Sequence, residues 1–199
     1  MTRQYELVER VKSYEPDADE ALLNRAYVYA MKAHGNQKRA SGAPFFSHPL
    51  EVAAILAEMR LDDATIATAL LHDTIEDSAW VSRGLLRERF GPEVARAVTA
   101  LTRPSAMQQQ AGDEDRYIDA VRALGPRVVA VKVFDRLNNL TGLHLRPRPA
   151  RERYLAESRR YYLPLAELVD PALVDQMASL ISHEESRLLD EERGAAPSG

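Results

Sequence analysis

The sequence predicts an all-α protein, and three observations support this interpretation. Apolar residues recur at helical spacing through nearly every segment of the 199-residue chain. Proline and glycine residues fall where these segments end. No stretch combines sustained apolar-polar alternation with an enrichment in β-branched side chains. We therefore expect a bundle of about nine or ten helices.

The expected helices follow one another along the chain with short breaks. Asp19 is expected to cap the second helix, and either Asp62 or Asp63 the fourth. The fourth helix is expected to continue without interruption to residue 77. The expected spans are 4–14, 19–33, 49–59, 62–77, 82–90, 94–101, 113–124, 128–143, 150–168 and 171–192.

The chain length suits one well-buried domain and is short for two. We find no internal repeat and no linker, so residues 1–193 are expected to form a single domain. Residues 194–199 are expected to form a disordered tail. Two irregular segments interrupt the helical pattern, 34–49 and the polar 104–112, and the second is expected to be mobile.

Charge and cysteine content exclude several kinds of site. The net charge of −4 argues against broad non-specific binding of nucleic acid. The chain has 0 cysteines, which excludes disulfides, thiolate zinc sites and a cysteine nucleophile, so any metal would need nitrogen and oxygen ligands. The chain start lacks an apolar signal region and no apolar run has the length of a membrane span. We expect a cytoplasmic protein without a membrane partner.

Segment 70–77, LLHDTIED, concentrates groups that bind metals or transfer protons. If it is helical, its imidazole and three carboxylates fall within roughly 140° on one side, at about 100° per residue. These residues are His72, Asp73, Glu76 and Asp77. Leu71 and Ile75 would then face the core together. Such a polar face is more often simply solvated, so its meaning depends on partners elsewhere in the chain.

Asp135 is one such partner, because it lies in a strongly apolar helical segment. An ionised carboxylate there is costly unless a cation compensates it. The cation could be Lys132 or Arg136 in an ordinary salt bridge, or it could be a metal ion.

His48, in the irregular segment 34–49, completes a candidate set of four nitrogen and oxygen ligands. The set is His48, His72, Asp73 and Asp135. Such ligands suit manganese, iron, zinc or cobalt, and the residues alone leave the choice open. The remaining histidines, His34, His144 and His183, are expected to be ordinary core or surface residues.

Three segments carry a family resemblance: RASGAPFFSHP (39–49), LLHDTIED (70–77) and VKVFDRLNNL (131–140). They are similar, in the same order, to the motifs of the HD-superfamily hydrolase domain of RelA/SpoT-type alarmone enzymes. The resemblance covers roughly residues 21–166 and implies the helical HD-domain fold. Because the chain ends at residue 199, it implies a stand-alone small alarmone hydrolase without a synthetase domain.

The resemblance also implies an activity, the removal of the 3′-diphosphate from (p)ppGpp to give GDP or GTP and pyrophosphate. The four candidate ligands match the family's ligands for one divalent metal ion, usually Mn²⁺. Glu76 and Asp77 match the acidic pair that positions and activates water, and either could be the proton acceptor. The residues expected to contact the nucleotide or its phosphates are Lys38, Arg39, Ser41, Asn139 and Tyr154, with Arg103 as a further candidate.

Several positions depart from the family pattern. Ala40 replaces a basic residue, Phe45 lacks the hydroxyl of the usual aromatic residue, Asn138 replaces a histidine, and Thr141-Gly142 replaces Arg-Thr. These departures leave open whether the alarmone base is guanine or adenine, as in ppApp, or whether another nucleotide phosphate is the substrate. A non-catalytic alarmone-binding protein is the alternative from another class. The residues do not distinguish a monomer from a homodimer.

Overall fold

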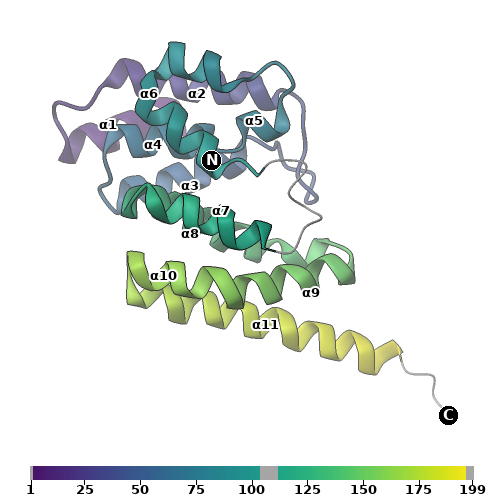
Figure 1. Cartoon of the computed structure of the whole chain (residues 1–199). Coiled ribbons are helices and arrows are strands. Elements are labelled where there is room, and N and C mark those ends of the chain that lie inside the picture. The colour runs from purple at the N-terminus through teal and green to yellow at the C-terminus, as the bar shows by residue number, and fades with distance from the viewer. Residues whose placement is uncertain (1, 104–111, 196–199) are drawn as a thin grey trace. The chain divides into compact units, whose positions relative to one another are not determined.

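The computed structural model describes residues 2–103 and 112–195, and all the regular secondary structure of these residues is helical (Figure 1). The predicted all-α class is confirmed. None of the helices in these two ranges has both the length and the apolar character needed to cross a membrane. The predicted loop at 104–112 and the predicted tail lie largely outside the described residues. The chain divides into two compact units, residues 1–135 and 136–199, which we describe separately.

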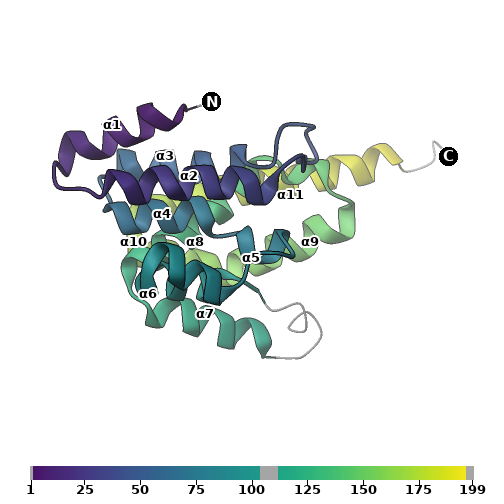
Figure 2. The ribbon, with the colours of Figure 1, turned by 90° about the horizontal axis from the view of Figure 1, so that it is seen from above.

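Helix α4 is the centre of the first unit. Its residues 65–71 are all buried, and the helix packs against α2, α3 and α6 (Figures 1 and 2). The small and aliphatic side chains of this helix allow three neighbours to approach it closely. The helices of this unit are α1 (Gln4–Tyr14), α2 (Glu20–His34), α3 (Ser47–Glu58), α4 (Asp63–Leu71), α5 (Thr74–Asp77), α6 (Arg83–Leu101), α7 (Asp113–Ala123) and the first part of α8 (Pro126–Thr141).

Side-chain caps fix where two of these helices begin. Asp19 accepts a hydrogen bond from the Leu22 backbone N–H, as predicted for the start of α2. At α4 the capping residue is Asp62, whose carboxylate accepts from the Thr65 N–H at 2.8 Å. The predicted break at Gly91-Pro92 is a kink inside α6, where Gly91 has a φ of 84° that only glycine adopts easily.

The prediction of one uninterrupted helix to residue 77 is wrong. Helix α4 ends at Leu71, the chain turns at His72 and Asp73, and α5 begins at Thr74. Polar side chains take the carbonyl groups that a continuing helix would use. The Nδ1 atom of His72 lies 2.7 Å from the Ala69 oxygen, and the Thr74 hydroxyl donates to the Leu71 oxygen. As a result Thr74 is buried in the position expected of Ile75, which is only half-buried.

The second unit contains the end of α8, the 3₁₀ turn η2 (Leu143–Leu145), α9 (Arg148–Glu157), the π-helical turn η3 (Ser158–Tyr162), α10 (Leu163–Val169) and α11 (Pro171–Ala195). Helices α10 and α11 pack side by side (Figure 1). Arg151 is buried between α9 and α11, where its Nε donates to Glu184 at 2.6 Å. This buried ion pair fastens α9 to α11 within the unit.

The helix predicted at 150–168 is interrupted by the π-helical turn η3, so the prediction of one regular helix is corrected. Pro164 has no N–H to donate to the preceding turn, and a wider turn accommodates it. The Ser158 hydroxyl donates to the Tyr154 oxygen at 2.6 Å. Arg136, in the same unit, donates to the Ser158 hydroxyl oxygen and to the Tyr154 oxygen. These side-chain hydrogen bonds supplement those of the backbone at the wider turn.

Candidate metal centre

The four predicted ligands come from three places in the first unit. His48 lies in the first turn of α3, after a loop closed by backbone hydrogen bonds from Arg39 to Ala43 and from Phe45 to Gln37. His72 and Asp73 form the turn between α4 and α5, and Asp135 lies on α8. Because residues 65–71 of α4 are all buried, His72 directly follows a firmly packed stretch of helix.

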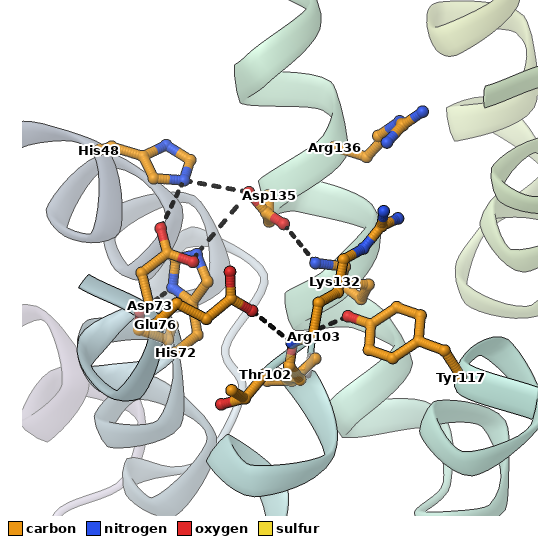
Figure 3. Close-up of polar contacts among 12 residues, drawn as sticks. His48, His72, Asp73, Glu76, Thr102, Arg103, Tyr117, Lys132, Asp135 and Arg136 are labelled. Carbon is orange, nitrogen blue, oxygen red and sulfur yellow. Dashed lines mark hydrogen bonds and ion pairs between the residues drawn. The ribbon is translucent and has the colours of Figure 1, made fainter. Parts of the chain in front are cut away.

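The four side chains converge on a common point (Figure 3). The His48 Nε2 atom lies 3.0 Å from Asp135 Oδ1 and 3.5 Å from Asp73 Oδ2. The His72 Nε2 atom lies 3.2 Å from Asp73 Oδ1 and 3.7 Å from Asp135 Oδ1. Both imidazoles are almost fully buried. Two imidazole nitrogens therefore face carboxylate oxygens of both aspartates at distances that a single cation between them could bridge.

His72 provides the test of whether these residues fit a metal ion. Its Nδ1 is engaged by the Ala69 carbonyl oxygen, which favours the tautomer with the proton on Nδ1 and leaves the Nε2 lone pair for a ligand. In the part of the chain that the structure describes, the buried Nε2 atom has no hydrogen-bond partner. Its nearest charged neighbours are the two carboxylates. An imidazole held in this way, among nitrogen and oxygen donors only, fits a divalent cation.

The buried imidazole of His72 and the carboxylates beside it shift one another's pKa values. Burial alone would lower the pKa of His72, but the adjacent Asp73 and Asp135 carboxylates raise it well above 6.5. Burial likewise would raise the pKa of Asp73, and His72 holds it below its usual value. A proton on the imidazole and a metal ion thus satisfy the same two carboxylates, and metal binding has to displace that proton.

Asp135 faces a metal ligand and a lysine with different oxygen atoms. Its Oδ1 faces His48, while its Oδ2 accepts from the Lys132 Nζ at 2.9 Å. Burial would raise the pKa of Asp135, but Lys132 and the two imidazoles lower it well below 3.8. Of the two explanations that the sequence left open, the salt bridge to Lys132 is present, and it leaves Oδ1 available to a cation.

Glu76 lies beside the cluster on α5 and points toward it (Figure 3). Its Oε1 accepts a hydrogen bond from the backbone N–H of Arg103, at the end of α6. Burial raises the pKa of Glu76, opposed by the Arg103 N–H and reinforced by the Asp73 charge. The Arg103 guanidinium pairs with Glu114 at 2.6 Å and lies over the Tyr117 ring. The contact between Arg103 and Glu76 is therefore made by the main chain of Arg103.

Asp77 faces the end of α2. The structure places His34 there, a residue expected from the sequence to be an ordinary core or surface histidine. Its Nδ1 lies 3.8 Å from Asp77 Oδ2 and 3.3 Å from Gln37 Oε1, and Gln37 donates to the Asp77 backbone oxygen at 2.7 Å. Burial, Asp73 and Glu76 raise the pKa of Asp77 to about 6. In the sequence, the one feature that could have indicated this contact is the three-residue spacing of His34 and Gln37 at the predicted helix end.

The predicted substrate contacts lie in two places. Lys38 and Ser41 are exposed in the loop before α3, and the Arg39 guanidinium lies 3.5 Å from Glu51. Asn139 and Tyr154 belong to the second unit, where the Arg136 guanidinium lies over the Tyr154 ring at 3.3 Å from its centroid. At the end of the loop, Phe45 stacks on His34 with ring centroids 5.0 Å apart and meets His48 edge-on. Nucleotide contact by all five residues stays a prediction.

Comparison with known proteins identifies the family. The family model described as "HD domain" matches residues 26–169, which include all four candidate ligands and extend across both units. The chain belongs to the HD domain family. This assignment confirms the predicted resemblance. HD domains bind divalent metals, and His48, His72 and Asp73 form a cluster that could hold such an ion.

The curated relatives of this HD domain are RelA/SpoT-type proteins. The "GTP pyrophosphokinase rsh" of Brucella ovis is 50% identical over 171 residues, which are 83% of this chain and 23% of that protein. The "guanosine-3′,5′-bis(diphosphate) 3′-pyrophosphohydrolase" of Aquifex aeolicus is 37% identical over 161 residues, which are 80% of this chain and 23% of that protein. The chain thus spans about a quarter of the length of these relatives.

A solved structure has the same fold. It is a metazoan orthologue of SpoT, described as hydrolysing ppGpp and playing a role in starvation responses. It superposes with a TM-score of 0.68 and 21% sequence identity, covering 80% of this chain and 93% of the solved chain. This HD domain therefore has the fold of a ppGpp hydrolase domain.

Proposed function

We propose that this HD domain is a metal-dependent (p)ppGpp 3′-pyrophosphohydrolase that gives GDP or GTP and pyrophosphate. The observation that carries the proposal is the convergence of two buried imidazoles and two aspartates on one point, with the Glu76 carboxylate beside it. A site that only bound a nucleotide would have no need of an acidic group held next to a metal centre. The activity in the name of the Aquifex aeolicus relative agrees with it.

His48, His72, Asp73 and Asp135 would hold one divalent ion, for which we propose Mn²⁺. When bound, such an ion lowers the pKa of a coordinated water and offsets the negative charge of the substrate phosphates. The protein's own contribution is to hold four donors in fixed positions. The Ala69 carbonyl oxygen orients His72, and Lys132 orients Asp135 through the oxygen that faces away from His48.

Glu76 is the proton acceptor in this proposal. Release of intact pyrophosphate requires a water oxygen to bond to the phosphorus attached to O3′, while the bond between that phosphorus and O3′ breaks. The water must lose a proton, and O3′ must gain one. The pKa of Glu76 is raised by burial, which makes it a better proton acceptor than an ordinary surface glutamate. The Arg103 N–H fixes one of its oxygens and leaves the other for the water.

In this proposal Asp77 helps to position the water rather than taking the proton, because its carboxylate is paired with His34 and its backbone oxygen accepts a hydrogen bond from Gln37. The phosphates would be bound by Arg39, Lys38 and Ser41 of the loop. Asn139 and Tyr154 are the other proposed nucleotide contacts. Arginine suits the phosphates because its planar group donates two parallel hydrogen bonds.

Adenine alarmones are a second candidate substrate class, and the observation that favours them concerns Phe45. It has no hydroxyl, and its ring is taken up by stacking on His34, so it offers no polar group to a base. An adenosine substrate such as ppApp would undergo the same reaction at O3′.

A substrate panel with added Mn²⁺ tests the proposal. The full chain is incubated with ppGpp, ppApp, NADPH or a deoxynucleotide, and pyrophosphate and nucleotide products are separated by ion-exchange chromatography. We expect pyrophosphate from ppGpp, complete loss of release with EDTA, and recovery when Mn²⁺ is restored. Turnover that persists in EDTA would contradict metal dependence. Tight ppGpp binding without products would favour the alternative, a non-catalytic alarmone-binding protein.

A further inference from the structure

A second cleft lies in the first unit, and it shares none of the residues of the metal centre. Its volume is about 520 Å³, which is within the range of cavities that hold small organic ligands. It opens between the start of α1, α2, the first half of α6 and the segment that joins α5 to α6. The side chains that matter here are three cations, Arg25, Lys32 and Arg89, and three aromatic residues, Tyr29, Trp80 and Phe90.

The cleft is electrostatically one-sided. No aspartate or glutamate lines it, although the chain as a whole carries a net charge of −4. In residues 2–103 and 112–195, neither Arg25, Lys32 nor Arg89 forms an ion pair with a carboxylate. Three cations around one cleft without local carboxylates produce a positive potential that attracts an anion.

The aromatic residues form a wall with one exposed ring. Tyr29 contacts Trp80 and Phe90 with ring centroids 5.0 Å and 5.1 Å apart, and the Arg89 guanidinium lies 5.8 Å from the Tyr29 centroid. The edge-on contact with Tyr29, which Phe90 contacts in turn, helps to hold the Trp80 ring in place. Trp80 nevertheless keeps 51% of its surface exposed. An indole that is held in place and still exposed can stack with a planar ring from the ligand.

Tyr29 also supplies a buried polar group without a partner. The residue is only 7% exposed, and its hydroxyl has no hydrogen-bond partner among the described residues. A buried hydroxyl without a partner is unfavourable, so this group would gain stability from a hydrogen bond to a water molecule or to a bound ligand. This hydroxyl lies on the residue that contacts both Trp80 and Arg89, at the junction of the aromatic wall and the cations.

We propose that this cleft binds a nucleoside phosphate, with the base stacked on Trp80 and the phosphates held by Lys32, Arg25 and Arg89. An inorganic anion would use the cations but not the exposed indole. An uncharged aromatic ligand would use the indole but not the cations. Only a ligand that carries both a planar ring and a negative charge uses all the features of the cleft. The inference does not depend on the hydrolase activity proposed for the metal centre.

Trp80 makes the test direct, because the chain contains 1 tryptophan. Quenching of tryptophan fluorescence by ADP therefore reports on this cleft, with free N-acetyltryptophanamide as the correction for absorption by the nucleotide. We expect saturable quenching by ADP. Lys32→Gln and Arg89→Gln each remove one charged hydrogen-bond donor but keep most of the aliphatic stem. Each should raise the Kd for ADP about tenfold or more.

Two control variants separate this cleft from other sites. Arg116→Gln removes a cation on α7 whose side chain is 71% exposed, and it should leave the Kd unchanged. Arg39→Gln changes the predicted phosphate contact of the metal centre, and it should also leave the Kd unchanged. Thermal unfolding of each variant shows whether it is folded, and isothermal calorimetry with Trp80→Phe measures the contribution of the indole.

Adenosine and pyrophosphate, each tested alone, complete the experiment. Both should bind at least tenfold more weakly than ADP. Binding of pyrophosphate as tight as that of ADP would show a simple anion site, and equal binding of adenosine would show that the cations do not act; either result overturns the proposal. So would the absence of saturable quenching, or quenching that Arg39→Gln abolishes while Lys32→Gln and Arg89→Gln do not.

Discussion

Replacing Asp77 with asparagine should stabilise the metal-free protein, although it removes a residue that we place in the active site. Burial is the main reason why the Asp77 carboxylate resists ionisation, and the charges of Asp73 and Glu76 add to it, opposed by the two imidazoles. The pKa of about 6 in the folded state compares with 3.8 for an unperturbed aspartate. Asparagine has nearly the same shape and no charge to lose.

The size and sign of the effect follow from these two pKa values. Between pH 3.8 and about 6 the folded state binds more protons than the unfolded chain, so the contribution of Asp77 to stability falls as the pH rises. Above pH 6 the full cost corresponds to about 3 kcal/mol. Because 31% of the Asp77 side chain is exposed, solvent screening reduces this figure, and we expect about 1–2 kcal/mol.

Urea unfolding of EDTA-treated protein at pH 7.5 and pH 4.5 measures the effect. Asp77→Asn should raise the free energy of unfolding at pH 7.5, and the gain should shrink to about a third at pH 4.5. Asp17→Asn, at an exposed position, serves as the control and should change stability by less than about 0.5 kcal/mol at either pH. A destabilised variant, or a gain that is the same at both pH values, would refute the electrostatic reasoning.

Three further predictions concern the metal centre and the second unit. Asp73→Ala should abolish both Mn²⁺ binding in calorimetry and turnover, and full activity would remove it from the ligand set. Glu76→Gln should bind Mn²⁺ normally but lower kcat about 10²–10⁴-fold; loss of the metal instead would make Glu76 a ligand. Glu184→Ala should lower the free energy of unfolding by about 3–5 kcal/mol, because it leaves Arg151 buried without that partner. The matched control Glu185→Ala breaks an exposed pair with Arg159 and should cost about 1 kcal/mol or less in urea unfolding.

The sequence predicted the fold class and most helix boundaries because these depend on local patterns. Asp19 precedes an apolar stripe and caps it, and Gly91-Pro92 interrupts the helix that contains it. The break at residues 72–73 was missed because it depends on a side-chain hydrogen bond from Thr74 to a helix carbonyl group, which the helical periodicity of the apolar residues does not report. The turn at 158–162 accommodates Pro164, and periodicity likewise does not report the Arg136 hydrogen bonds made at this turn.

The ligand candidates could be found from the sequence because their chemistry is unusual for their surroundings. Asp135 stands out as a carboxylate in an apolar helix, and the structure brings its Oδ1 to within 3.7 Å of both imidazoles. His34 could not be found in the same way, because a buried histidine at a helix end is ordinary until its neighbour is known. The Arg103 backbone N–H that holds Glu76 was beyond reach for a simpler reason, since every residue except proline has such a group.

The arrangement separates the two tasks of the proposed reaction by the rigidity of their supports. His72 follows directly from the most buried helix of the first unit, as a metal ligand requires, because ligand positions must hold to a fraction of an ångström. Glu76 and Asp77 lie one turn further, on the short helix α5, which is tied to its neighbours through Thr74, Gln37 and the Arg103 N–H. Burial and repulsion by neighbouring carboxylates, above all Asp73, raise the pKa of both groups, so their ionisation is less favourable than that of an exposed carboxylate. The burial that would make Asp77→Asn more stable also raises the pKa of Glu76, the proposed proton acceptor, and a raised pKa makes its ionised form a better acceptor.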